Sequence, residues 1–132
     1  MSAKPDRKAP FEFRLDFSSG VPVYRQLIDQ VQLAIAAGTL TGGQQLPTVR
    51  QVAVDLAINP NTVMRAYREL EIRGILTTQQ GSGTFVTPQK VEEADAKRQE
   101  RLSRLAAECA SKAGAEGISL QELVDRLKEM LP

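Results

Sequence analysis

The sequence contains no histidine, no tryptophan and a single cysteine, Cys109. One cysteine cannot form an internal disulfide, and without histidine it cannot complete a zinc site of the usual kind. Nucleophilic catalysis by a Ser-His or Cys-His pair is excluded as well. Carboxylate and lysine chemistry stay open, but no pair of residues indicates either. We therefore predict that the chain is not an enzyme and that it holds no cofactor and no metal ion.

Long apolar runs and an excess of positive charge are also missing. No apolar stretch is long enough to span a membrane, and the start MSAKPDRKAP lacks the apolar segment of a secretory signal. We therefore expect a cytoplasmic location and no membrane partner. The regions 1–21, 22–88 and 89–132 carry four cations against three anions, five against four, and eight against nine. Nucleic-acid binding would then need positive charge arranged on one face.

What is present is an ordinary globular composition, 42% hydrophobic and 25% charged, in 132 residues, which suits one domain with an appendage. Residues 1–10 are polar with two prolines and are expected to be a disordered tail. The alternating run FEFRLDF (11–17) predicts a short, half-buried strand. Residues 22–37 predict an amphipathic helix, because apolar residues recur every three or four positions from Tyr24 onward, and Gly38 is placed to end it.

A pair of short helices is predicted next. The first runs from Thr48 to Leu56, and its TxxQ start has the spacing of a capping box. The second begins at Asn59 and Pro60, a favoured N-cap followed by a favoured first helical residue, and continues to about Arg73. Because only three residues separate these helices, the pattern predicts a helix-turn-helix.

Two β-prone runs, ILTT (75–78) and TFV (84–86), flank the turn QQGSG and predict a hairpin. A hairpin directly after a helix-turn-helix is a wing. Gly81 and Gly83 could serve only to allow positive φ in the turn, or they could also let the backbone approach a phosphate or the minor groove. A dinucleotide-binding fingerprint is disfavoured, since the third glycine and a following helix are missing.

The tail predicts two amphipathic helices. The first covers residues 91–113, with acidic and basic residues four apart, and Gly114 and Gly117 interrupt the pattern after it. Ser119 then has the spacing of a capping box for a last helix. Cys109 lies on the apolar stripe of the first helix, where a buried structural cysteine is favoured over a redox sensor.

This tail of about 45 residues is near the lower limit for an independent core. We therefore predict that it pairs with a second copy and makes the chain a homodimer, while the alternative, in which the tail folds back onto its own winged domain, stays open. The dimerisation residues expected from the apolar stripes are Leu102, Leu105, Leu120, Leu123, Val124 and Leu127.

The second helix of the helix-turn-helix carries the strongest functional signal. On a helical wheel with steps of about 100° per residue, Val63 and Tyr67 face the core, and Asn61, Arg65 and Arg68 face the opposite side. Arginine can bind guanine with two hydrogen bonds, and asparagine can do the same with adenine. A polar outer face is also common on any surface helix, so it is the helix-turn-helix context that favours DNA.

Residues 22–87 resemble the winged-helix domain of the GntR family of bacterial transcription regulators. The resemblance is carried by the stretches PVYRQLIDQVQLAIAAGTL, LPTVRQVAVDL, INPNTVMRAYRELEIRGIL and GSGTFV, which cover about half of the chain. The combination LPxxR…TV…R…GxGTFV is highly specific. NPNTVMRAYRELE and the short tail are most similar to the YtrA-type subfamily.

This resemblance implies that Arg50 in LPTVR and Thr62 and Arg65 in the following helix contact DNA, and that the wing tip enters the minor groove. Many family members have a basic residue at the position of Pro60, and that contact is not carried over. Longer relatives add an effector-binding or aminotransferase-like domain, and we expect neither here. The expected DNA-binding residues are Thr48, Arg50, Asn61, Thr62, Arg65, Arg68, Ser82 and Gly83.

We therefore predict a mainly α fold, with a winged helix-turn-helix and two-stranded wing over residues 11–88 and a helical hairpin over residues 89–132. Its function would be sequence-specific binding of a double-stranded DNA operator, an inverted repeat, by a homodimer. Repression is the favoured outcome, because a bound dimer can occlude a promoter. A winged helix used only for protein contact is disfavoured by the Asn and Arg side chains. A small-molecule effector stays open, since a groove between the tail helices of a dimer could hold one.

Overall fold

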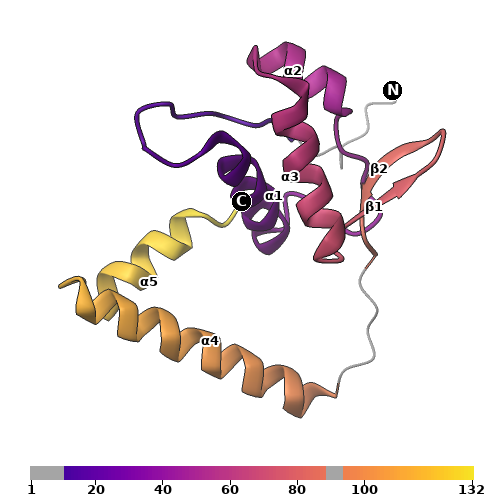
Figure 1. The fold of residues 1–132 in the computed structure, drawn as a ribbon. Helices are drawn as coiled ribbons and strands as arrows, with labels where there is room; N and C mark the ends of the chain where they lie inside the picture. Colours follow the sequence, from indigo (N-terminus) through magenta and orange to yellow (C-terminus); the bar gives the residue numbers. More distant parts are fainter. Residues whose placement is uncertain (1–10, 89–93) are drawn as a thin grey trace, which may run out of the picture. The chain divides into compact units, whose positions relative to one another are not determined.

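The computed structural model describes residues 11–88 and 94–132, so the expected disordered tail at residues 1–10 lies outside the described residues. The chain divides into two compact units, residues 1–89 and residues 90–132. As described, the first unit contains α1 (Val23–Ala37), α2 (Val49–Leu56), α3 (Pro60–Ile72), β1 (Leu76–Gln79) and β2 (Gly83–Val86), and the second contains α4 (Asp95–Ala115) and α5 (Leu120–Glu129) (Figure 1). The mainly helical fold with a two-stranded wing and a C-terminal helical pair is confirmed.

The core of the first unit forms where α1 packs against α3. Leu27, Ile28 and Val31 of α1 and Val63 and Leu70 of α3 are completely buried. Their spacing of three and four places them on one face of each helix, as the apolar pattern predicts. Burying a side chain of this kind stabilises the fold by roughly 1.5–3 kcal/mol, so these residues fix how α3 is held against α1.

Tyr67 links α3 to the start of α2. Its ring is buried, and its hydroxyl donates a hydrogen bond of 2.6 Å to the main-chain carbonyl of Pro47. Burial raises the pKa of the Tyr67 phenol well above its usual value, so the hydroxyl stays protonated and remains a donor. Because Pro47 directly precedes Thr48, the N-cap of α2, this bond ties the two helices of the helix-turn-helix together.

The strand expected over residues 11–17 is not formed. Residues 11–16 lie outside any helix or strand. Phe11, Phe13 and Leu15 are buried or half-buried, but Phe17 is 73% exposed, and within the described residues the segment has no partner strand. Two glutamines of α1 replace that partner. Gln30 Oε1 accepts from the N–H of Arg14 (2.8 Å) and Gln26 Oε1 from that of Asp16 (2.9 Å), and both side-chain amides donate back to the carbonyls of the same residues. Four residues of a helix are about as long as two residues of extended chain, so Gln26 and Gln30 are spaced to reach Asp16 and Arg14.

A three-residue turn joins α2 to α3, as predicted. Thr48 Oγ1 accepts a hydrogen bond from the N–H of Gln51 (3.0 Å), and Asn59 Oδ1 accepts one from the N–H of Asn61 (2.8 Å). Both caps satisfy main-chain donors that have no partner inside a helix. Ala57, which ends α2, has a φ of 56°. A left-handed backbone is unfavourable for a residue with a Cβ, so the turn stores strain at Ala57.

β1 and β2 pair antiparallel and form the predicted wing, with Gln79 opposite Gly83 at the tip. The main-chain N–H of Ser82 donates to the carbonyl of Gln79 (2.9 Å) and closes the turn. Gly81, the third residue of that turn, has a φ of 82°. A turn of type II requires positive φ at this position, so a glycine is suited to it.

The loop between α1 and α2 pairs with the other edge of β2, which the sequence pattern did not predict. The N–H of Leu46 donates to the carbonyl of Thr84 (2.9 Å), and the N–H of Val86 donates to the carbonyl of Gln44 (2.9 Å). Main-chain hydrogen bonds therefore hold β2 from both sides, and they anchor the wing to the loop that leads into α2.

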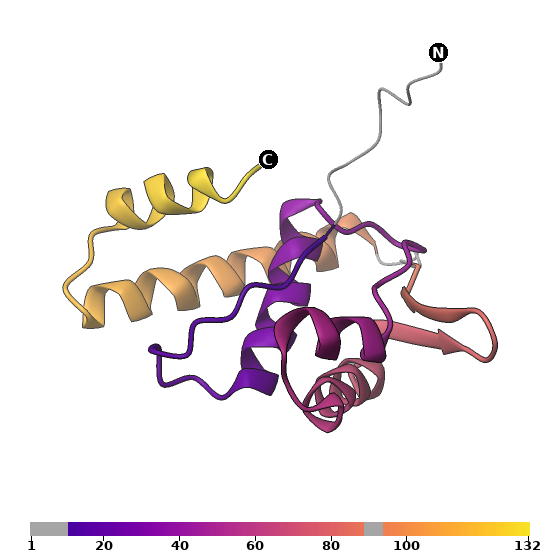
Figure 2. The same ribbon diagram turned by 90° about the horizontal axis from the view of Figure 1, so that it is seen from above.

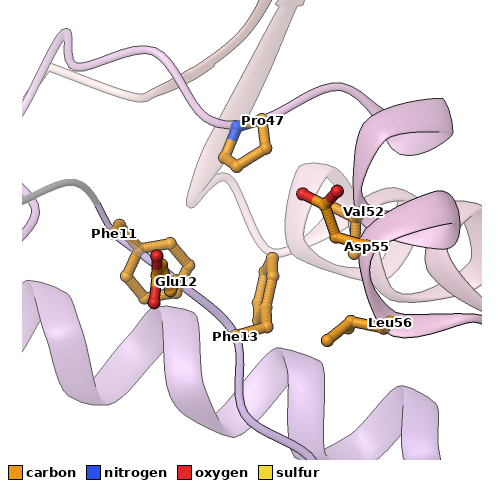
Figure 3. Close-up of a pocket in the computed structure, with 7 residues that line it drawn as sticks. All are labelled: Phe11, Glu12, Phe13, Pro47, Val52, Asp55 and Leu56. Carbon is orange, nitrogen blue, oxygen red and sulfur yellow. The ribbon is translucent and has the colours of Figure 1, made fainter.

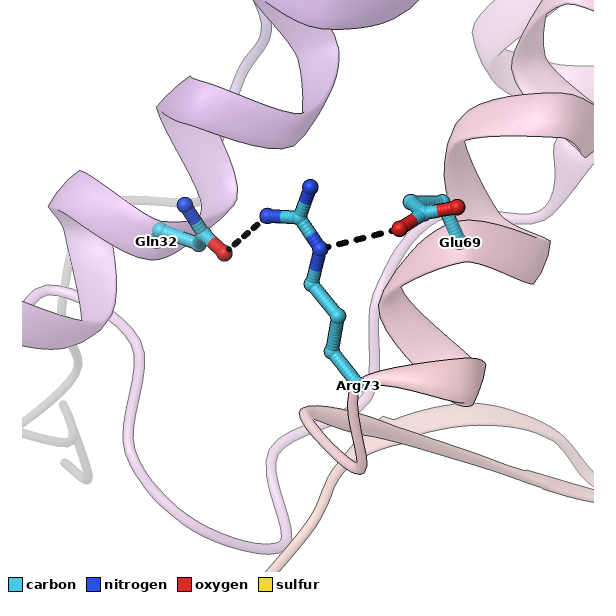
Figure 4. A network of polar contacts seen from close by, with 3 residues as sticks. All are labelled: Gln32, Glu69 and Arg73. Carbon is cyan, nitrogen blue, oxygen red and sulfur yellow. Dashed lines mark hydrogen bonds and ion pairs between the residues drawn. The ribbon is translucent and has the colours of Figure 1, made fainter.

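Arg73 connects the end of α3 to α1 (Figure 4). Its Nε lies 3.1 Å from Glu69 Oε2, and its Nη1 donates a hydrogen bond of 2.8 Å to Gln32 Oε1. A surface ion pair contributes little to stability by itself. The role of Arg73 is therefore geometric, because its guanidinium bridges the two helices beside the core.

α4 and α5 form the predicted helical hairpin. Ser119 begins α5 with a complete capping box, since its Oγ accepts from the N–H of Glu122 (3.1 Å) and the Glu122 carboxylate accepts from the N–H of Ser119 (3.2 Å). The predicted interruption at Gly114 is wrong, because α4 continues through it to Ala115. One glycine costs a helix only about 1 kcal/mol. Gly117, with a φ of 76°, lies in the connection.

The second unit buries few of its apolar side chains. Within its described residues Ala113 is the only buried hydrophobic one, and Leu123 and Val124 are half-buried. Cys109, which we expected to be buried, is exposed, so that prediction is wrong for the chain alone. The exposed fractions of the other expected dimerisation residues are 55% for Leu102, 58% for Leu105, 60% for Leu120 and 48% for Leu127. None of the described helices is apolar over the length that crossing a bilayer needs.

The strain at Ala57 gives a stability prediction. We expect Ala57→Gly to raise the free energy of unfolding by about 0.5–1 kcal/mol, because relief of the left-handed strain exceeds the extra entropy of glycine in the unfolded chain. Ala36→Gly, at an exposed position in α1, is the control and should lower the same free energy by about 0.5–1 kcal/mol. Urea unfolding followed by circular dichroism measures both, and a destabilised Ala57→Gly would contradict the assignment of strain.

Candidate nucleic-acid interface

α3 lies between α1 and the wing (Figures 1 and 2). Its polar side chains face away from the core. Asn61, Arg65 and Arg68 are exposed on this face, as the helical wheel predicts, and Thr62 is half-buried. The face contains an open hollow, and the residues that line it are Asn61, Met64, Arg65, Arg68, Glu69 and Ile72. The structure therefore brings three of the four expected α3 residues to one exposed surface, where their side chains can be approached together.

Two apolar residues of this surface were missed in the sequence. Met64 is 42% exposed and Ile72 is 74% exposed. The helical wheel places both outside the buried stripe, so the spacing of residues in α3 is a signal for their exposure. Apolar side chains can contact the methyl group of thymine in the major groove. The face can therefore make apolar contacts as well as hydrogen bonds.

Arg65 lies against an aromatic ring of α1. Its guanidinium carbon is 3.7 Å from the centroid of the Tyr24 ring, and that of Arg25 is 5.8 Å from the same centroid. At both distances a cation is attracted to the negative face of the ring. The sequence pattern assigns Tyr24 only to the apolar face of α1. Its contact with Arg65 depends on how two helices pack, which residue spacing does not reveal.

Thr48 and Arg50 are exposed at the first turn of α2. The hydroxyl of Thr48 accepts the capping hydrogen bond from Gln51. A hydroxyl that accepts can still donate its own hydrogen, so Thr48 can cap the helix and donate to a phosphate oxygen at the same time. The positive end of the helix dipole and the charge of Arg50 both favour an anion here.

Gln45 holds the tip of the wing. Its Nε2 donates a hydrogen bond of 3.0 Å to the carbonyl of Ser82, which is itself exposed. Gly83 has a φ of 125°, and a Cβ at this position would lie 2.6 Å from Gln45 Nε2. Gly81 also has positive φ, but the space beside it is open. Gly81 thus serves the turn alone, while Gly83 also makes room for Gln45.

The expected site residues of α2, of α3 and of the wing make no hydrogen bond to one another within the described residues. The hydrogen bonds of Thr48 are made with Gln51 and Val52 of its own helix, and those of Ser82 with Gln45 and with Gln79 of the wing turn. A site that includes α2, α3 and the wing would therefore have to be spanned by one extended ligand.

A second hollow lies beside α2, and its chemistry differs from that of the α3 face. Its volume is about 410 Å³, and the residues that line it are Phe11, Glu12, Phe13, Pro47, Val52, Asp55 and Leu56 (Figure 3). The rings of Phe11 and Phe13 meet edge to face with centroids 4.8 Å apart. The carboxylates of Glu12 and Asp55 would repel a phosphate, so this hollow does not belong to a surface for nucleic acid.

The chain matches the family model described as "Bacterial regulatory proteins, gntR family" over residues 23–86. It is 35% identical over 113 residues to the uncharacterized HTH-type transcriptional regulator YhcF of Bacillus subtilis (strain 168), covering 85% of this chain and 92% of that protein. It is 34% identical over 121 residues to the HTH-type transcriptional repressor YtrA of the same organism, covering 89% and 90%. The solved structure of YtrA from Sulfolobus acidocaldarius, a GntR-family transcription factor, has a TM-score of 0.55 and 28% identity, covering 88% and 93%.

The contact between Gly83 and Gln45 gives a prediction for the wing. We expect Gly83→Val to weaken binding to duplex DNA at least about tenfold, because the new side chain strains the backbone and displaces Gln45 from the tip. The helical circular dichroism signal should stay largely unchanged. The control is Gly117→Asn, which alters a glycine of positive φ with open space in the second unit and should leave affinity unchanged. Fluorescence anisotropy measures the affinities.

Two outcomes would contradict this prediction. Loss of the helical signal in Gly83→Val would show that the glycine is needed for folding. A folded variant with full affinity would show that the wing tip makes no contact with DNA.

Proposed function

Because this chain belongs to the GntR family of bacterial regulatory proteins, as a YtrA-type member, we propose that it binds an inverted-repeat operator in the cytoplasm as a homodimer and represses transcription. Proteins of this family are DNA-binding transcription regulators and not enzymes, as expected from the sequence. The observation that carries the proposal is the outward face of α3, with Asn61, Arg65 and Arg68 exposed around one hollow.

Each part of the interface has a distinct task in this proposal. Asn61, Arg65 and Arg68 enter the major groove and contact base edges, since amide and guanidinium groups can bond adenine and guanine with two hydrogen bonds. Thr62 lies at the side of the same face. Contacts to phosphate set the orientation of the domain but carry no direct sequence information. We assign them to Thr48 and Arg50 of α2, while Ser82 and Gly83 at the wing tip approach the minor groove.

The homodimer is supported by the apolar surface of the second unit. About half of the surface of each of Leu102, Leu105, Leu120 and Leu127 is exposed, and Leu123 and Val124 are half-buried. Burying such a side chain completely contributes roughly 1.5–3 kcal/mol. Pairing with a second copy about a two-fold axis would bury both sets at once. A two-fold protein contacts two half-sites about one helical turn apart, so the operator is an inverted repeat.

Repression follows from the same arrangement. A dimer bound across a promoter excludes other proteins from it, and one similar regulator, YtrA of Bacillus subtilis, is named a transcriptional repressor. A small-molecule effector would have its place in a groove between the tail helices of the dimer, where it could alter the separation of the two winged domains.

The dimer is tested by light scattering. We expect the full chain to be dimeric at tens of micromolar, and a chain truncated after Pro88 to be a folded monomer that binds the operator much more weakly. Leu105→Glu should also yield a monomer, because it places a charge in the apolar face. Ser111→Glu is the matched control on the opposite side of α4, and it should stay dimeric. A truncated chain that remains dimeric, or a monomeric full chain, would contradict the assignment.

The base contact is tested at Arg65. We expect Arg65→Ala to weaken binding to a duplex selected from a random-sequence pool by about 1–3 kcal/mol, with a much smaller effect on a scrambled duplex. Arg14→Ala removes the same charge from an exposed position outside α2, α3 and the wing, and should leave the ratio of the two affinities unchanged. Fluorescence anisotropy at two salt concentrations provides the ratio. An unchanged ratio in Arg65→Ala would remove this residue from base contact.

A further inference from the structure

The contact between Arg65 and Tyr24 joins the helix-turn-helix motif to α1, which is not part of that motif. Tyr24 belongs to the first turn of α1, and Arg65 is on the outward face of α3. The guanidinium carbon of Arg65 lies 3.7 Å from the centroid of the tyrosine ring, much closer than that of Arg25 at 5.8 Å. At this distance the flat guanidinium group can lie in contact with the ring.

We propose that Tyr24 is a positioning residue for Arg65, so that sequence recognition by α3 depends on an aromatic ring of α1. The inference rests on the proposed function, in which Arg65 contacts a base. Tyr24 itself need not touch a base for this purpose. It acts by restricting where the guanidinium of Arg65 can be.

The geometry suits this role because stacking and hydrogen bonding use different parts of a guanidinium group. The ring contacts the flat face, while the N–H donors point outward in the plane of the group. Arg73 provides the contrast, since its N–H groups are bonded to Glu69 and Gln32 (Figure 4). An arginine held by hydrogen bonds has fewer donors left for a ligand. Arg65, held through its face, keeps its donors for a base edge.

The ring is itself held in place. Tyr24 is half-buried and packs against the hydrophobic core, and Leu27 and Ile28, one turn further along α1, are completely buried. A long arginine side chain loses much rotational freedom when it is fixed on a ligand. A rigid ring that restricts the side chain beforehand lowers this loss and so strengthens binding.

The test is a double-mutant cycle on the full chain. The readout is the ratio of affinities for a duplex selected from a random pool by the wild-type protein and for its scrambled version. We expect Tyr24→Leu to lower this ratio about three- to tenfold and Tyr24→Phe, which keeps the ring, to change it less than about twofold. Arg65→Met should lower it further, and the double variant Tyr24→Leu/Arg65→Met should match Arg65→Met, since the ring then has nothing to position.

Arg25→Met is the matched control for charge, because it removes the more distant cation beside the same ring. It should leave the ratio unchanged. If it lowers the ratio as much as Tyr24→Leu does, the ring acts through the general positive potential, and the inference is overturned. An unchanged ratio in Tyr24→Leu, or purely additive effects of Tyr24→Leu and Arg65→Met, would overturn it as well.

A measurement without DNA keeps the test decisive even where Tyr24→Leu does not fold. In the NMR spectrum of the free wild-type protein, the δ-methylene protons of Arg65 should be shifted upfield by the ring current of Tyr24, and the shift should persist in Tyr24→Phe. Its absence would overturn the inference. If Arg65→Met lowers the ratio of affinities and Tyr24→Leu leaves it unchanged, the role of Tyr24 is overturned while the proposed function stands. Failure of the protein to select any duplex defeats the proposed function itself.

Discussion

The packing of α1 against α3 is the contact on which the rest of the first unit depends. The centre of this packing is apolar. Two further contacts join the same helices, one between Tyr24 and Arg65 and one between Gln32 and Arg73. The partners in these contacts are eight residues apart on both helices, so the same stretch of each helix is used, about 12 Å long. α3 is thereby fixed in position and in rotation about its own axis. A helix that must present three side chains to one ligand needs both constraints, since a small rotation moves every side chain on its surface.

What the sequence predicted well was local. The caps at Thr48, Asn59 and Ser119 depend on residues within three positions of each other, and the structure contains all three. The outward face of α3 followed from helical periodicity alone. The strand expected over residues 11–17 failed for the opposite reason. Its alternation correctly gave Phe11, Phe13 and Leu15 as buried or half-buried, but it was wrong for Phe17, which is exposed, and a strand also needs a partner. Here the partner is a pair of glutamine side chains on α1. An alternation of apolar and polar residues within the segment carries no information about such a partner.

The contacts made between distant segments were equally out of reach. Nothing in the spacing of residues relates Gln45 to Ser82, or Tyr24 to Arg65, because these pairs meet only after the helices have packed. The second unit shows a related limit. Periodicity predicted its apolar stripes, yet Cys109 and four of the six expected leucine and valine positions are exposed. An apolar stripe predicts that something covers it, and only a partner surface determines whether burial follows.

Charge links these features to recognition. The region 22–88 carries only one more cation than anions, so attraction to phosphate cannot be its main advantage. The arrangement of the charges compensates in part for the low net charge. Glu69 is paired with Arg73, and Asp55 lies at the hollow beside Glu12. Arg65 and Arg68 share the outward face of α3. With few positive charges, each must be placed well to matter. A strongly basic domain could tolerate a mobile arginine, since neighbouring cations would hold the DNA in place. Here, under the proposed function, selectivity rests on a few side chains with fixed geometry, which is why an aromatic ring that restricts one guanidinium group can affect recognition by the whole helix.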